Sequence, residues 1–186
     1  MIPTHAKKVF SGVLFDVYQW EQELFDGSTS TFEMIKQQDT VQILAIKDET
    51  IMIQEQEQPG GRPFLCLPGG RIELGEEALA GAKRELLEET GFASERWSLY
   101  HHREASGHMQ RNFFVYLARD CDCVQQQQLD PGERIHVRWV SLDALIELVD
   151  SGMLTRIDDD VRMELIRANY HEPQKKELIQ RLHMRV

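Results

Sequence analysis

The sequence predicts an α+β fold in which a mixed β-sheet is sandwiched between helices. Short β-branched or alternating segments are interspersed with segments of strong helix formers, an order typical of α/β/α sandwiches. The chain has 186 residues, of which 41% are apolar and 28% charged, which suits one main domain with a sizeable core. We expect this domain to fold alone or as an oligomer.

The N-terminal segment predicts a β-hairpin that extends the main domain. Apolar and polar residues roughly alternate over residues 9–23, Asp26 and Gly27 supply a turn, and the alternation resumes over residues 31–35. An isolated hairpin is marginal in water, so its apolar side chains need another surface. These side chains are Phe15, Val17, Trp20 and Phe25. We expect a second copy of the chain to supply that surface in an isologous homodimer.

The middle of the chain predicts three strands followed by a loop and a helix. The strands span residues 41–46, 51–53 and 63–67. The last strand ends at Pro68-Gly69-Gly70, which indicates a loop. Strong helix formers then fill residues 76–90, and Gly91 tolerates the left-handed conformation just past a helix end.

The C-terminal part predicts alternating strands and helices. The strands span residues 97–100, 113–118 and 135–140. Ser141 is expected to cap a helix that runs to about residue 149. A last helix over residues 158–170 is expected to be broken by Pro173, with a helical tail beyond it.

Residues 119–133 are long for a connection and include four consecutive glutamines at 125–128. Such a segment is either disordered or functional, and the sequence leaves both interpretations open.

The charge and the cysteines restrict the partners and the compartment. Twenty-one basic and 31 acidic residues give a net charge of −10, which argues against non-specific nucleic-acid binding. The N-terminus lacks an apolar signal segment, and no run approaches the ~18 apolar residues of a membrane span. Cys66, Cys121 and Cys123 are odd in number and indicate reduced thiols; Cys121 and Cys123 also lack the second ligand pair that zinc needs. We therefore expect a cytoplasmic protein without a membrane or nucleic-acid partner.

Three glutamates at helical spacing are the best candidates for a metal site. Glu85, Glu88 and Glu89 lie at i, i+3 and i+4, where like charges repel without a counter-charge. A hard divalent cation such as Mg²⁺ prefers clustered carboxylates and takes further ligands from water and substrate phosphates. Arg84 can orient one of the carboxylates. The alternative is a solvated acidic face on which Lys83 and Arg84 are the partners.

The order of residues around these glutamates resembles the Nudix box. It reads Gly70, five residues, Glu76, seven residues, Arg84-Glu85-Leu86, one residue, Glu88-Glu89, one residue, Gly91-Phe92. Phe92 departs from the family, which usually has an aliphatic residue there. The resemblance implies the Nudix fold over residues 39–186, with residues 1–38 as a dimerising extension.

The same resemblance implies hydrolysis of a nucleoside diphosphate linked to another moiety. Mg²⁺ or Mn²⁺ would be held by Glu85, Glu88 and Glu89, and the Gly69 carbonyl would complete the set. Glycines at 69 and 70 let the main chain turn sharply and approach metal and pyrophosphate. Glu76, at the expected helix start, would complement the helix dipole.

Outside the box, the chain is most similar to the ADP-ribose and ADP-sugar pyrophosphatase branch. The similarity rests on the N-terminal hairpin, on Ile53-Gln54-Glu55-Gln56, and on Gly132-Glu133-Arg134-Ile135 leading into Trp139-Val140-Ser141-Leu142. Two positions depart from the branch: Glu57-Gln58 stands where an aromatic and an arginine are usual, and Ala105-Ser106-Gly107 stands where a proline is usual. The branch implies dimers in which the hairpin crosses to the neighbour and helps to wall the nucleotide site.

Further site residues follow from this comparison. A glutamate on a loop is expected to be the general base, and Glu133 is the candidate, with Asp130 as the alternative. Arg84 and Glu88 are expected to take part in catalysis. Gly70, Arg62 and Ser106 are expected to bind substrate, and Arg103 is left open. His101, His102 and His108 are expected to be structural rather than a metal site.

These residues leave two kinds of function open. One is hydrolysis of ADP-ribose or an ADP-sugar to AMP and a sugar phosphate, or the same chemistry on NADH, another nucleotide sugar, or a capped or oxidised nucleotide. The other is a non-catalytic Nudix-like module that binds a nucleotide for regulation, a role that normally accompanies lost box carboxylates.

Overall fold

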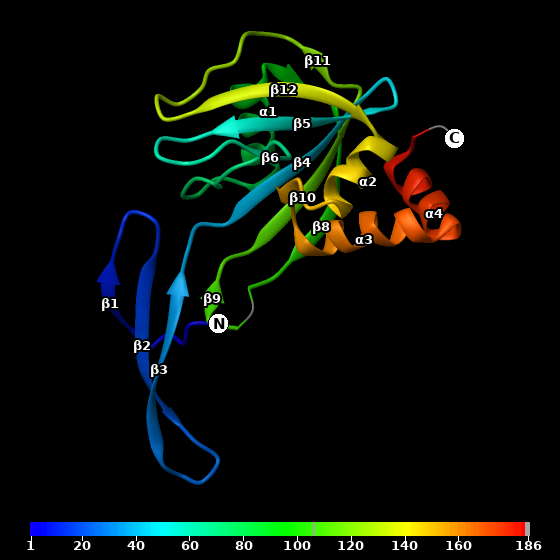
Figure 1. The fold of residues 1–186 in the computed structure, drawn as a ribbon. Helices are drawn as coiled ribbons and strands as arrows, with labels where there is room; N and C mark the ends of the chain where they lie inside the picture. Colours follow the sequence, from blue (N-terminus) through cyan, green and yellow to red (C-terminus); the bar gives the residue numbers. More distant parts are fainter. Residues whose placement is uncertain (106, 185–186) are drawn as a thin grey trace.

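The main domain is a mixed sheet with helices on both faces (Figure 1). The computed structural model describes residues 1–105 and 107–184. The helices are α1 (Ala78–Thr90), α2 (Leu142–Asp150), α3 (Asp159–Tyr170) and α4 (Glu172–Leu182). Neighbouring residues of the central strand β4 (Thr40–Lys47) point to opposite faces, as strand geometry requires. Leu44 packs with α2, α3 and α4, whereas Ile43 packs with α1. The predicted α/β/α sandwich is confirmed.

The main sheet has the strand order β13-β6-β5-β4-β10-β8, and β12 pairs with β5. Its other strands are β5 (Thr50–Glu57), β6 (Phe64–Cys66), β8 (Arg96–Arg103), β10 (Phe113–Arg119), β12 (Arg134–Ser141) and β13 (Leu154–Arg156). Strands β4 and β10 are parallel, whereas β5 is antiparallel to both β6 and β12. A separate two-stranded pair joins β7 (Phe92–Ala93) to β11 (Asp122–Cys123).

The N-terminal segment forms its own sheet, which projects from one end of the main domain (Figure 1). Its strands are β1 (Lys7–Ser11), β2 (Asp16–Glu23), β3 (Thr29–Lys36) and β9 (Met109–Gln110). The expected hairpin is present as β2 and β3, but residues 9–23 are not one strand. Gly12 donates its N–H to the Phe15 carbonyl and turns the chain between β1 and β2. Apolar side chains stay uncovered on this sheet and its turns: Val9, Phe10, Val13, Leu14, Phe15, Phe25 and Phe32.

Several element boundaries differ from the prediction. Helix α1 begins at Ala78 rather than at residue 76, and α4 begins at Glu172. Pro173 therefore lies in the first turn of α4, where a missing N–H costs nothing, and it starts the helix rather than breaking it. The short strand β13 was not expected. The cap of α2 is confirmed, because Ala144 donates its N–H to the Ser141 hydroxyl at 3.2 Å.

Among residues 1–105 and 107–184, none of the helices is both long and apolar enough to cross a membrane.

Candidate active site

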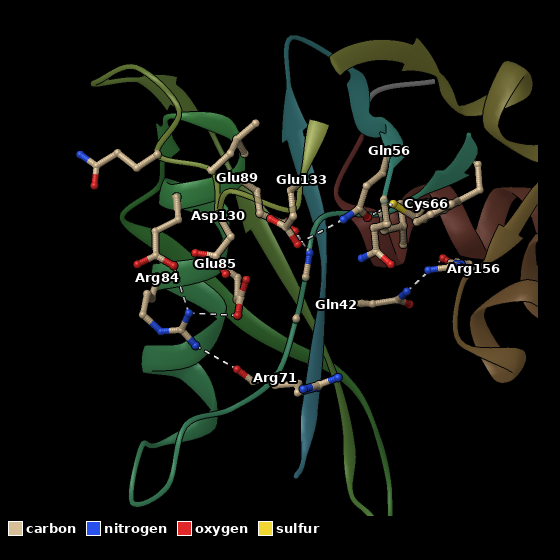
Figure 2. A pocket seen from close by; sticks show the side chains of 18 residues that line it. Gln42, Gln56, Cys66, Arg71, Arg84, Glu85, Glu89, Asp130, Glu133 and Arg156 are labelled. Atoms are coloured by element: carbon tan, nitrogen blue, oxygen red, sulfur yellow. Dashed lines mark hydrogen bonds and ion pairs between the residues drawn. The ribbon is translucent and has the colours of Figure 1, made fainter. Parts of the chain in front are cut away.

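A pocket of about 450 Å³ lies between α1, the glycine turn after β6, strand β13 and the loop before β12 (Figure 2). Glu85, Glu88 and Glu89 of α1 line it, and so do Asp130 and Glu133 of the loop. The pocket is therefore strongly acidic on the α1 side.

The two glycines after Pro68 are required by close approach of the chain. A Cβ on Gly69, whose φ is +150°, would lie 2.2 Å from the Val41 carbonyl oxygen, and one on Gly70 would lie 2.4 Å from Glu85 Oε1. Val41 donates its N–H to the Gly70 carbonyl at 2.9 Å, which holds the turn against β4. Within the described part of the chain, the neighbouring Gly69 carbonyl accepts no hydrogen bond. It is free to bind a ligand.

Glu89 is the most buried of the box glutamates, with 5% of its surface exposed. Its Oε2 accepts hydrogen bonds from Gln54 Nε2 and from the Gly69 N–H, both at 2.9 Å. The pKa of Glu89 is raised to about 8: burial is the main cause, the nearby Glu85 and Glu133 carboxylates add to it, and the two hydrogen bonds act in the opposite direction. A cation bound beside the Glu89 carboxylate would therefore be strongly favourable.

Arg84 donates hydrogen bonds to three carboxylates. It donates to both oxygens of Glu76 at 3.0 Å, to Glu85 at 3.0 Å and to Glu88 at 3.1 Å. Glu76 lies before α1 and also accepts from the Glu73 N–H, so it closes the loop onto Arg84 and is not part of the first helical turn. Burial raises the pKa of Glu85, although Arg84 acts in the opposite direction.

The glutamine-rich segment packs against α1. Gln127 Nε2 donates to the carbonyls of Glu89 and Ile135, and the Gln128 N–H donates to the Glu88 carbonyl. This packing positions Glu133 at the pocket. Burial raises the pKa of the Glu133 carboxyl, and the negative charge of Asp130 adds to the effect.

Two glutamines and a cysteine behind these acids were not expected. Gln54 is fully buried and reaches Glu89, whereas Gln56 Nε2 lies 3.4 Å from Glu133 Oε1. The Cys66 thiol lies 3.5 Å from Gln54 Oε1 and 3.6 Å from Gln56 Oε1. Burial raises the pKa of Cys66 to about 12, so the thiol keeps its proton as a donor. The signal in the sequence was a pair of amides at alternate positions of an apolar strand.

The expected substrate-binding residues fall in different places. Gly70 lines the pocket, whereas Arg62 is exposed and outside its lining. Ser106 lies outside the described residues. Arg71 and Arg156 line the pocket although the sequence did not single them out.

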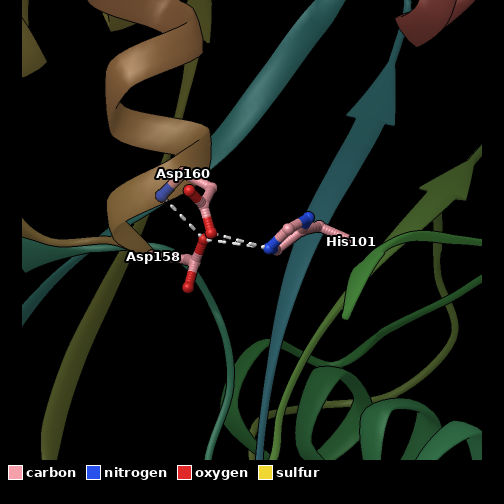
Figure 3. Close-up of side chains that lie close together, drawn as sticks. All are labelled: His101, Asp158 and Asp160. Atoms are coloured by element: carbon pink, nitrogen blue, oxygen red, sulfur yellow. Dashed lines mark hydrogen bonds and ion pairs between the residues drawn. The ribbon is translucent and has the colours of Figure 1, made fainter. Parts of the chain in front are cut away.

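His101 lies beside two acidic residues at the start of α3 (Figure 3). Its Nε2 is 2.9 Å from Asp160, and one ligand atom each of His101, Asp158 and Asp160 lie within 4.8 Å of one another. However, Asp158 caps α3 by accepting from the Asp160 N–H, and its other oxygen pairs with Arg103 at 3.1 Å. A guanidinium in contact with the cluster disfavours a second cation, which supports a structural role for His101.

The donor set of the pocket fits a hard divalent cation. Carboxylate and carbonyl oxygens are its preferred ligands, and three glutamates with the unbonded Gly69 carbonyl supply them around one cavity. Burial is the main cause of the raised pKa of Glu85 and of Glu89, and a bound cation would favour the charged form of both carboxylates.

A glycine turn is followed by a helix with three clustered glutamates in an α/β/α sandwich, which is the arrangement that the resemblance to the Nudix box implied. Residues 36–159 match the family model described as NUDIX domain. The chain belongs to the Nudix family, and it is a pyrophosphohydrolase.

Two sequence relatives and one solved structure are among the proteins similar to it. An ADP-ribose pyrophosphatase of Bacillus subtilis (strain 168) is 32% identical over 149 residues, which cover 78% of this chain and 80% of the relative. A methanol dehydrogenase activator of Bacillus methanolicus is 26% identical over 148 residues, 77% of this chain and 80% of the relative. A solved structure entitled "Crystal structure of ADP compounds hydrolase" shares the fold, with a TM-score of 0.71, 19% identity and coverage of 92% and 94% of the two chains.

We predict that the metal-free protein loses stability as the pH rises. The pKa of Glu89 is about 8 in the folded protein against an ordinary value of 4.5, so between these values the folded state binds a proton that the unfolded state has lost. Stability from this group is therefore greatest at low pH and is lost as the pH approaches about 8. Scanning calorimetry with a chelator, from about pH 6 to about pH 9, should show a falling Tm. Glu89→Gln should flatten that fall; parallel curves for both proteins would contradict the assignment.

Proposed function

We propose that this protein hydrolyses the diphosphate linkage of ADP-ribose or an ADP-sugar and releases AMP and a sugar phosphate. The observation that carries the proposal is one pocket in which the box glutamates face Glu133. The name of the Bacillus subtilis relative supports ADP-ribose as the substrate.

We assign Mg²⁺ or Mn²⁺ to Glu85, Glu88, Glu89 and the Gly69 carbonyl. When bound, such a cation neutralises phosphate charge and lowers the pKa of a coordinated water. The protein holds the ligands for it: Gln54 and the Gly69 N–H fix Glu89, and Arg84 orients Glu85 and Glu88.

We assign the general base to Glu133. Its carboxyl lies in the pocket, and its raised pKa brings it closer to neutrality, where a base accepts a proton most effectively. Gln56 contacts its Oε1 and limits the directions in which it can turn.

Glu133→Gln is expected to lower turnover by about 100-fold or more while leaving metal affinity unchanged, because a general base contributes about 10²- to 10⁴-fold. Asp130→Asn is the matched control, since it removes a neighbouring carboxylate of the same loop. Steady-state kinetics and Mn²⁺ titration measure the two effects. Unaltered turnover in Glu133→Gln, with a collapse in Asp130→Asn, would move the base to Asp130.

The substrate is tested with purified protein and Mg²⁺ on a panel of diphosphate compounds, with identification of the products. ADP-ribose and ADP-sugars should give equimolar AMP and sugar phosphate at the highest kcat/KM. Faster hydrolysis of NADH, another nucleotide sugar, or a capped or oxidised nucleotide would show that ADP-ribose is not the preferred substrate, while the proposed hydrolysis of a diphosphate linkage would stand.

A non-catalytic nucleotide-binding regulator is the second candidate, favoured by the similarity to the methanol dehydrogenase activator. All box carboxylates are retained in this chain, which supports hydrolysis over binding alone. A protein that binds AMP tightly and hydrolyses no member of the panel would support the regulator.

We further propose that the protein is a homodimer, with residues 1–38 as the dimerising extension of a hydrolase domain at 39–186. The support is the N-terminal sheet, on which Phe10 and Phe32 are 52% and 40% exposed. A second copy would cover these side chains. The three free thiols support a reducing, cytoplasmic location.

A further inference from the structure

Arg156 is a cation fixed in the wall of the acidic pocket. Its guanidinium carbon lies 3.4 Å from the centroid of the Phe64 ring, so the guanidinium lies over the face of the ring. Among the residues that the structure describes, the ion pairs do not include Arg156. Arg84, by contrast, is engaged by three glutamates. The Arg156 guanidinium is therefore available to bind a ligand in the pocket.

The backbone around Arg156 is fixed by neighbouring strands. In the parallel pairing of β13 with β6, Arg156 lies opposite Cys66. Gln42 clamps the same segment, because its Nε2 donates to the Arg156 carbonyl at 3.0 Å and its Oε1 accepts from the Asp158 N–H at 2.9 Å. Side chains placed by strands hold their geometry better than side chains on loops.

The chemistry of this wall differs from that of the α1 wall. Figure 2 shows Arg156, Gln42 and Cys66 across the pocket from Arg84 and Glu85. The side chains beside Arg156 are aromatic or uncharged, whereas the carboxylates lie on α1 and its facing loop. A planar guanidinium stacked on an aromatic ring offers its other face to a further flat group, and nucleobases stack on arginine in this way.

We propose that Phe64 and Arg156 form the platform on which the nucleobase of the substrate stacks. The diphosphate then runs from this platform to the box glutamates across the pocket. Because stacking uses the face of the base and not its edge, the platform favours purines over pyrimidines by area and does not by itself distinguish adenine from guanine. This inference rests on the proposed hydrolysis of a nucleoside diphosphate compound.

The test compares Arg156→Ala and Arg156→Lys with wild type by kinetics on ADP-ribose and by inhibition with AMP, UMP and inorganic pyrophosphate. Both variants should raise the KM for ADP-ribose and the inhibition constant of AMP by at least about tenfold, because both lack the planar guanidinium. Lysine keeps the positive charge and so isolates the effect of the plane. Turnover and inhibition by pyrophosphate, which has no base, should stay within about twofold. The preference for AMP over UMP should shrink in both variants.

Two further variants complete the design. Phe64→Leu keeps apolar bulk under Arg156 but removes the ring, and it should raise the same constants. Arg138→Ala is the control, because Arg138 is exposed on β12 outside the lining of this pocket.

The outcomes separate the platform from its alternatives. A wild-type KM in Arg156→Lys together with a raised KM in Arg156→Ala would mean that the charge binds phosphate, and it would overturn stacking. Unchanged constants in all three variants would overturn the platform while hydrolysis stands. If wild type hydrolyses no compound of the panel, the proposed function fails, and AMP binding by calorimetry still decides whether Arg156→Ala weakens a base site.

Discussion

Glu85→Gln and Glu89→Gln are each expected to lower turnover by about 100-fold or more at saturating Mg²⁺ while the fold survives. Each change removes one charged ligand from a site whose remaining ligands must balance a divalent cation and a diphosphate, a loss of several kcal/mol of transition-state stabilisation. Glutamine has nearly the shape of glutamate, so the contacts of Glu89 with Gln54 and Gly69 can be retained. Steady-state kinetics with a magnesium titration measures the effect.

Glu77→Gln is the matched control, because Glu77 is exposed at the N-cap of α1 and makes no capping hydrogen bond with its side chain. It should keep wild-type turnover. If Glu85→Gln and Glu89→Gln hydrolysed the best substrate within a factor of a few of wild type, the metal role of the cluster would be wrong.

Removal of residues 1–39 is expected to abolish both the dimer and the activity. Among the described residues, the pairing of β3 with β9 places Ile35 opposite Met109, and the N-terminal sheet leaves apolar side chains uncovered. If a second copy covers them, the sheet of one subunit lies against the other and walls its nucleotide site. Light scattering at micromolar concentration and activity at serial dilution measure the two effects.

A point variant keeps this prediction testable if the truncated chain misfolds. Phe32→Glu places a charge on the uncovered face of the sheet and should give a folded monomer of low activity. Met153→Glu is the control, because Met153 is an exposed apolar residue of the main domain. A wild-type protein that is monomeric and equally active at every dilution would contradict the proposed dimer.

The acidic part of the site could be predicted because its information is local. Glu85, Glu88 and Glu89 lie on one helix, so their spacing alone places them together. The start of that helix could not be read in the same way. Glu76 is a good helix former, but its carboxylate turns back to Arg84 and to the Glu73 N–H. Helix propensity does not describe such contacts.

The rest of the pocket depends on strand pairing between distant segments. Gln54 meets Cys66 only through the antiparallel register of β5 with β6, and Arg156 meets Phe64 only because β13 joins the edge of that sheet. Strand β13 has three residues, too few for a period of two to be visible. The wall of the pocket that carries Arg156 could therefore not be predicted from the sequence, whereas the acidic wall on α1 could.

The central claim is that the box glutamates support cation-dependent hydrolysis of a nucleoside diphosphate compound. The most direct test is a single-turnover measurement of AMP release from ADP-ribose, with protein in excess, in Mg²⁺ and in a chelator. We predict rapid release of AMP and sugar phosphate in Mg²⁺, no release in the chelator, and recovery when Mg²⁺ is restored. Release that continues at the same rate in the chelator, or that keeps the wild-type rate in Glu85→Gln, would contradict it.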